Sequence, residues 1–126
     1  MGTNYYMITK DKDCRDRCFG FDYEIADTPD WGYICHICKL TGGWKPLLQS
    51  HEKHSSFAGL KAICLNNPEI RIIDEYGEYF TWQDFEKTVR TWWKDSKFPL
   101  RSHMDLHAPG YYTDAEGFDF SAHDFR

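Results

Sequence analysis

The chain has 126 residues, a formal net charge of −5 and a sequence pI near 5.6. This length is typical of a single domain with one hydrophobic core, so 1–126 is taken as one domain. The acidic balance argues against non-specific nucleic-acid binding, which needs a basic face to displace counterions. No apolar run resembles a signal peptide or reaches the length of a membrane span, so we expect a cytoplasmic protein with no membrane contact.

The first part of the chain predicts mainly β-structure. Residues 4–9 are rich in aromatic and β-branched side chains and are typical of a strand. Residues 11–17 are charged and too few for a helix, so we interpret them as a turn or knuckle. Residues 19–25 alternate between apolar and polar side chains, as a half-buried strand does. Residues 33–39 form another strand-like run, and 44–48 are expected to pair back on it.

Two helices are predicted in the middle of the chain. Ser55 or Ser56 is expected to cap a short helix with apolar residues at helical spacing. Residues 70–73 form a strand. The principal amphipathic helix, at about 82–95, carries one apolar stripe made of Trp82, Phe85, Val89, Trp92 and Trp93. These elements predict an α+β fold with a small antiparallel sheet.

Residues 99–126 are interpreted as an extended C-terminal tail. Pro99 lies shortly beyond the principal helix, and the following residues are loop-like as far as Gly110. Residues 117–121 alternate again between apolar and polar side chains, so we expect them to add to the sheet as an edge strand.

Four cysteines are the strongest chemical signal. They form two pairs, Cys14-x₃-Cys18 and Cys35-x₂-Cys38. In a reducing compartment, paired cysteines are more often metal ligands or redox groups than disulfides. Two such pairs can bring four thiolates to one tetrahedral ion, so we predict a structural, zinc-knuckle-like Zn²⁺ site. The alternative is that some of these cysteines are small buried residues or a redox pair.

Histidines compete with these cysteines as ligands. His36 lies inside the second pair, although in a strand its side chain points away from that of its neighbour. His51 and His54 enclose a glutamate, but the second histidine comes one residue too early for HExxH. His103 and His107 have the i,i+4 spacing of a metal pair on a helix. We interpret both pairs as surface histidines, the alternative being that they surround the open zinc position of an enzyme.

Short blocks spread over most of the chain resemble a family of small, uncharacterised phage and prophage proteins. The chain opens with Met-Gly-Thr-Asn-Tyr-Tyr at 1–6, as that family does, and an early cysteine pair follows. Residues 36–44, His-Ile-Cys-Lys-Leu-Thr-Gly-Gly-Trp, are similar to the family's stretch His-Ile-Gly-Lys-Ser-Ser-x-Gly-Trp. Residues 72–77 and 112–121 resemble later blocks of the same family.

The resemblance implies a phage-encoded protein with a cysteine and histidine metal site, and it implies no activity. Cys38 stands where the family usually has glycine. The family pattern therefore favours Cys14, Cys18 and His36 as ligands, whereas the spacing favours the four cysteines.

No catalytic set emerges from the sequence, so we predict a phage accessory protein that binds a host protein. Inhibition of a host defence or transcription component would fit the negative charge, the 17% aromatic content and a metal-stapled fold. An alternative is a zinc-containing nucleic-acid-binding module. In it, Trp44 would stack on bases beside four basic residues, which are Arg15, Arg17, Lys39 and Lys45. A metal-dependent enzyme is the third hypothesis.

Overall fold

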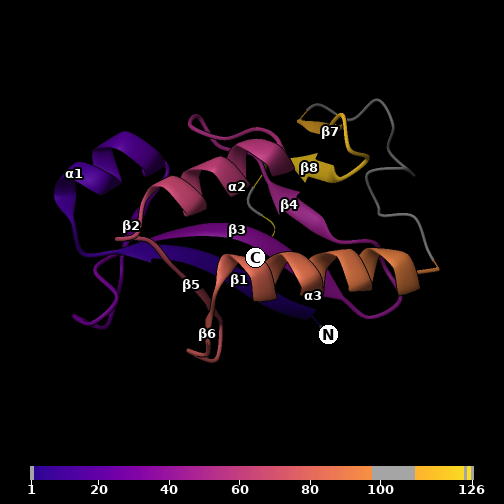
Figure 1. Cartoon of the computed structure of the whole chain (residues 1–126), viewed down its shortest axis with the longest axis horizontal. Helices are drawn as coiled ribbons and strands as arrows, with labels where there is room; N and C mark the ends of the chain where they lie inside the picture. The colour runs from indigo at the N-terminus through magenta and orange to yellow at the C-terminus, as the bar shows by residue number, and fades with distance from the viewer. Residues whose placement is uncertain (1, 98–109, 124, 126) are drawn as a thin grey trace.

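The computed structural model describes residues 2–97, 110–123 and 125. Its strands are β1 (Gly2–Thr9), β2 (Glu24–Ile25), β3 (Tyr33–Thr41), β4 (Leu47–Gln49), β5 (Arg71–Asp74), β6 (Tyr79–Phe80), β7 (Tyr111–Thr113) and β8 (Asp119–Ser121). Its helices are α1 (Lys12–Cys14), the π-helical segment η1 (Arg15–Phe19), α2 (Phe57–Asn66) and α3 (Trp82–Asp95). The predicted α+β class is confirmed (Figure 1). No helix in the described ranges is long and apolar enough to cross a bilayer.

All the described strands belong to one sheet, in the order β6-β5-β1-β3-β4-β8-β7, with β2 paired to β3. The neighbours are antiparallel, as expected, except that β4 and β8 run parallel. The strand predicted near the C-terminus is present as β8. It lies between β4 and β7 and not at the edge of the sheet, because Phe118 and Phe120 are buried in the core.

Both longer helices cover the same face of the sheet (Figure 1). The principal helix has the predicted bounds, and Thr81 caps it by accepting a hydrogen bond from the Asp84 backbone N–H at 3.1 Å. Its buried residues are Trp82, Phe85 and Val89. Trp93, which we had placed on the apolar stripe, is 41% exposed. The short helix α2 is capped by Ser56, as predicted.

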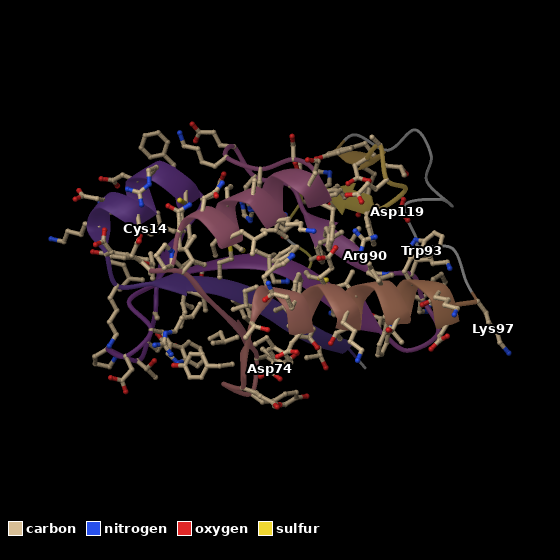
Figure 2. The ribbon with its side chains drawn as sticks, viewed as in Figure 1. Cys14, Asp74, Arg90, Trp93, Lys97 and Asp119 are labelled. Carbon is tan, nitrogen blue, oxygen red and sulfur yellow. The ribbon has the colours of Figure 1, made fainter. Side chains whose placement is uncertain are left out.

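Arg90 links α3 to the turn that joins β7 and β8 (Figure 2). Its guanidinium lies 2.8 Å from Glu86 and 3.1 Å from Glu116. It also lies over the rings of Phe57 and Phe118, which stack on each other with centroids 4.4 Å apart. The C-terminal strands are thereby attached to both helices.

The turn predicted at 11–17 is wrong, because residues 12–19 are helical. Asp11 caps the segment by accepting a hydrogen bond from the Cys14 backbone N–H at 2.8 Å. The strand predicted at 19–25 is reduced to its last two residues. Tertiary packing explains both differences. Burial of Cys14, Cys18 and Phe19 stabilises a helix that is too short to form alone.

A β-bulge determines which side chains of β3 reach the helices. The register of β1 and β3 places three pairs opposite one another: Tyr5 with Cys38, Tyr6 with His36, and Met7 with Cys35. Residues directly opposite each other share a face, and alternate residues of β1 share a face too. Cys35 and Cys38 therefore face the helices together, because the bulge adds one residue between them. His36 lies on the other face.

Candidate metal centre

Three side chains from β3 and from the segment after β4 lie together in the interior. They are Cys35, His51 and His54, and one ligand atom from each lies within 4.8 Å of the other two. Cys35 is 2% exposed and His54 3%, while the side chain of His51 is 11% exposed. Thiolate sulfur and imidazole nitrogen are the donors that zinc prefers in proteins. This group can hold a metal ion.

A short turn brings the two histidines together. The backbone N–H of His51 donates to the carbonyl of His54 at 2.9 Å, and the two ring centroids lie 4.8 Å apart. The preceding residue anchors the turn to the sheet, because the Ser50 N–H donates to the Ser121 carbonyl at 2.8 Å. Backbone hydrogen bonds thus close the turn and attach it to β8, and the ring of His51 contacts β3.

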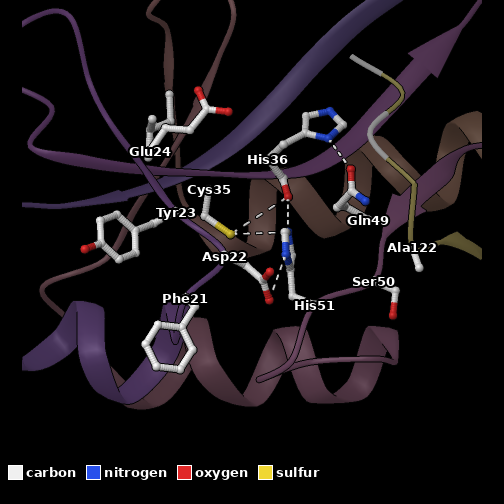
Figure 3. Close-up of a pocket in the computed structure, with 11 residues that line it drawn as sticks. Phe21, Asp22, Tyr23, Glu24, Cys35, His36, Gln49, Ser50, His51 and Ala122 are labelled. Carbon is white, nitrogen blue, oxygen red and sulfur yellow. Dashed lines mark hydrogen bonds and ion pairs between the residues drawn. The ribbon is translucent and has the colours of Figure 1, made fainter.

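His51 has contacts at both ring nitrogens (Figure 3). Nε2 lies 3.3 Å from Cys35 Sγ and donates to the backbone carbonyl of His36 at 2.6 Å. Nδ1 lies 3.5 Å from Asp22 Oδ2, an oxygen that also accepts the Glu52 backbone N–H at 2.8 Å. A carboxylate behind the ring is the arrangement that orients metal-ligating histidines. Metal binding at Nε2 would require this proton to leave and the close contact with the His36 carbonyl to be given up.

His54 is the most unusual residue of the group. Both of its ring nitrogens are buried, and neither has a hydrogen-bond partner among the described residues. Burial, and secondarily the neighbouring His51, lowers the pKa of His54 to about 3. A buried polar atom without a partner costs roughly 1–3 kcal/mol. The ring is neutral at physiological pH, so it presents a free lone pair of the kind that a metal requires.

The four cysteines predicted as ligands lie in different surroundings. Cys35 belongs to the group above. Within the described part of the chain, no group of metal-ligating side chains includes Cys14, Cys18 or Cys38. Cys38 shares a face with Cys35, and burial raises the pKa of its thiol. The four-cysteine zinc site therefore remains a prediction.

Cys14 and Cys18 lie on the helical segment α1–η1, in a sulfur-rich part of the core. The main cause that raises the pKa of Cys14 to about 11 is burial. Burial also raises the pKa of Cys64 to about 12, with smaller contributions from Cys18 and Cys14. Cys64 Sγ lies 3.6 Å from Met7 Sδ. Cys14 and Cys64 are therefore protonated at neutral pH and pack as small apolar side chains.

His36, the competing ligand, is engaged on the opposite face of the sheet. Its Nδ1 lies 2.9 Å from Gln49 Oε1 and its Nε2 lies 2.9 Å from Asn4 Oδ1. The amide nitrogen of Gln49 donates to the Ser121 carbonyl at 3.0 Å, so its oxygen faces the ring and His36 Nδ1 carries a proton. The ring of His36 therefore lies away from the metal-ligating group.

The interpretation of His51 and His54 as surface histidines is wrong. His54 is buried, and the side chain of His51 is 11% exposed and lies between Asp22 and Cys35 of β3. The signal available in the sequence was the pair of histidines three residues apart in a turn, but it did not reveal the distant Cys35 as their neighbour. His103 and His107 lie outside the described residues.

A pocket of about 260 Å³ opens beside the group. Cys35 and His51 form part of its wall, whereas His54 is not among its lining residues (Figure 3). The polar lining includes Asp22, Tyr23, Glu24, Gln49 and Ser50. One side of the metal-ligating group therefore faces a cavity, and the other side faces the core.

Comparison with known proteins adds no assignment. No protein-family model matches the chain, and searches of curated proteins and of solved structures found no match.

Burial of neutral His54 predicts a pH-dependent stability in the chelator-treated protein. Its folded-state pKa of about 3 lies below the ordinary value of 6.5. The contribution of neutral His54 to the free energy of unfolding is therefore complete above pH 6.5. It is lost as the pH falls toward 3, because the unfolded chain then binds a proton at this residue and the folded chain does not. We expect wild type to lose about 2 kcal/mol more than His54→Leu between about pH 7.5 and about pH 5.

Urea unfolding of both proteins at the two pH values measures this difference. Leucine has a similar volume and does not titrate, so the difference between the two curves reports mainly on His54. Parallel losses of stability in the two proteins would contradict a buried, neutral His54.

Proposed function

We propose that this protein binds one zinc ion through Cys35, His51 and His54, and that the ion fastens the segment after β4 to β3. The observation that carries the proposal is His54, whose two buried ring nitrogens have no hydrogen-bond partner among the described residues and lie beside a thiol and a second imidazole. Zinc accepts this mixture of sulfur and nitrogen donors, and hard cations such as magnesium do not.

The surroundings of the three ligands support this assignment. Asp22 stands behind the ring of His51, as carboxylates do in zinc proteins. The ligands come from two segments, β3 and the residues after β4, which come together only in the folded chain. A bound ion would therefore add its binding free energy to the stability of the fold. The same buried arrangement carries a cost when no ion satisfies His54.

We also propose, from the sequence, that the zinc-bound form is a phage accessory protein that binds a host protein in the cytoplasm. Two exposed apolar side chains near the pocket support an interaction surface, since Phe21 is 90% exposed and Ile25 is 77% exposed. Aromatic residues are enriched in protein–protein interfaces.

The nucleic-acid alternative has less support, because two of its proposed basic contacts are already engaged. Arg15 pairs with Asp16 at 2.8 Å and lies over the ring of Tyr33 at 4.6 Å. Arg17 pairs with Glu69 at 3.2 Å. Binding phosphates with these side chains would require giving up those contacts.

Metal content per chain tests the zinc proposal. Wild type, expressed and purified with zinc under reducing conditions, should carry about one ion per chain by elemental analysis. Cys35→Ser and His54→Ala should lose it. Cys38→Ser is the matched control, because this cysteine lies on the same strand, faces the same side and is also buried, yet belongs to no ligand group among the described residues.

Loss of zinc in Cys38→Ser, together with retention in His54→Ala, would favour the four-cysteine site over the proposed one. A folded wild type that takes up no zinc would contradict both sites.

A further inference from the structure

Three protein ligands leave a tetrahedral zinc with one unfilled position. Building on the zinc site proposed above, we propose that this fourth position faces the pocket and takes a ligand from outside the chain. The ligand is water in the resting protein. A small molecule with one neutral nitrogen donor, such as imidazole or an unprotonated primary amine, replaces that water.

The arrangement of the three ligands determines that the fourth coordination position faces the pocket. Cys35 and His51 line the pocket, whereas His54 is 3% exposed and lies outside the pocket lining. An ion held by all three would therefore have its inner side covered by His54 and its outer side turned to the cavity. Structural zinc sites close all four positions with protein, and sites with exchangeable ligands keep one open.

No other described side chain is placed to close the site. Within residues 2–97, 110–123 and 125, no fourth cysteine, histidine or carboxylate belongs to the group. Asp22 contacts His51, but its Oδ2 lies on the Nδ1 side of the ring and accepts the Glu52 N–H. The ring separates this carboxylate from the nitrogen that faces Cys35.

The charge of the pocket selects among external ligands. Among the residues that the structure describes, its lining includes the carboxylates of Asp22 and Glu24 and no lysine or arginine. The Cys35 thiolate would offset one of the two positive charges of the ion. Anionic ligands would therefore meet two further negative charges, which disfavours carboxylates and thiolates and leaves water and neutral nitrogen donors.

The size of the pocket sets a second limit. A volume of about 260 Å³ is slightly below the range of roughly 300–1,000 Å³ that drug-sized ligands occupy. A single five-membered ring or a short amine fits such a cavity, whereas a large substrate would have to extend past its mouth.

Cobalt substitution tests the open position. Co²⁺ bound by the three residues should give visible absorption bands that depend on the coordination sphere. Imidazole added to the Co²⁺-loaded wild type should shift these bands saturably. Azide should require a higher concentration, and Glu24→Gln should tighten azide binding by roughly two- to fivefold. Glu78→Gln removes an exposed carboxylate at the β5–β6 turn and should leave azide binding unchanged.

The outcomes separate this inference from the zinc site on which it rests. Co²⁺ that binds but whose spectrum does not respond to imidazole would overturn the open position and leave the metal site standing. Failure of wild type to bind Co²⁺ or Zn²⁺ would overturn both. Equal azide affinity in wild type and Glu24→Gln would overturn the proposed charge selection.

Discussion

Zinc is expected to raise the free energy of unfolding of wild type by about 4 kcal/mol when its free concentration is about 1,000 times its dissociation constant. The reason is linkage: an ion that binds the folded chain and not the unfolded chain shifts the equilibrium toward folding. Urea unfolding followed by circular dichroism, with buffered zinc and with chelator, measures the difference under reducing conditions.

His54→Leu is the matched control for this prediction. It removes one ligand, and it replaces the two unpartnered ring nitrogens with an apolar group of similar volume. The chelator-treated variant should therefore be at least as stable as chelator-treated wild type, and zinc should not stabilise it further. A stability of wild type that does not change with zinc, or an equal response in the variant, would contradict the three-residue site.

Phe85→Ala is expected to lower the free energy of unfolding by about 3–5 kcal/mol. The ring is fully buried beneath α3, with its centroid 5.4 Å from that of Tyr5 on β1 and 5.5 Å from that of Trp82. Alanine would leave a cavity between the helix and the sheet. A domain of this kind has about 5–15 kcal/mol of stability in total, so the loss is a large share of it.

The same urea experiment on Phe21→Ala provides the control, because Phe21 is 90% exposed and its removal should change stability by no more than about 0.5 kcal/mol. If Phe85→Ala cost as little as Phe21→Ala, the packing of α3 against β1 would be wrong.

Local patterns predicted α3 and α2 well because their signals are local. Thr81 and Ser56 each cap a helix within their own sequence neighbourhood, and the apolar residues of α3 repeat at helical spacing. The segment after Asp11 failed for the opposite reason. It is helical only because tertiary contacts bury its cysteines and Phe19.

The candidate site depends both on local sequence signals and on tertiary contacts. The cysteine spacing drew attention to Cys35, and the pair His51 and His54 was visible as a weak candidate. Their assembly depends on which face of β3 each residue occupies. An alternating strand would place Cys35 and Cys38 on opposite faces, but the bulge places them on the same face.

By itself, the sequence determined the α+β class, the bounds of the principal helix and the presence of thiols and imidazoles suited to a soft metal. These properties follow from composition and from residues a few positions apart. Only the tertiary structure decided which of those side chains meet. A metal-ligating group joins residues that are distant along the chain, and the pairing register, the β4–β8 contact and the burial of His54 depend on the packing of the whole domain.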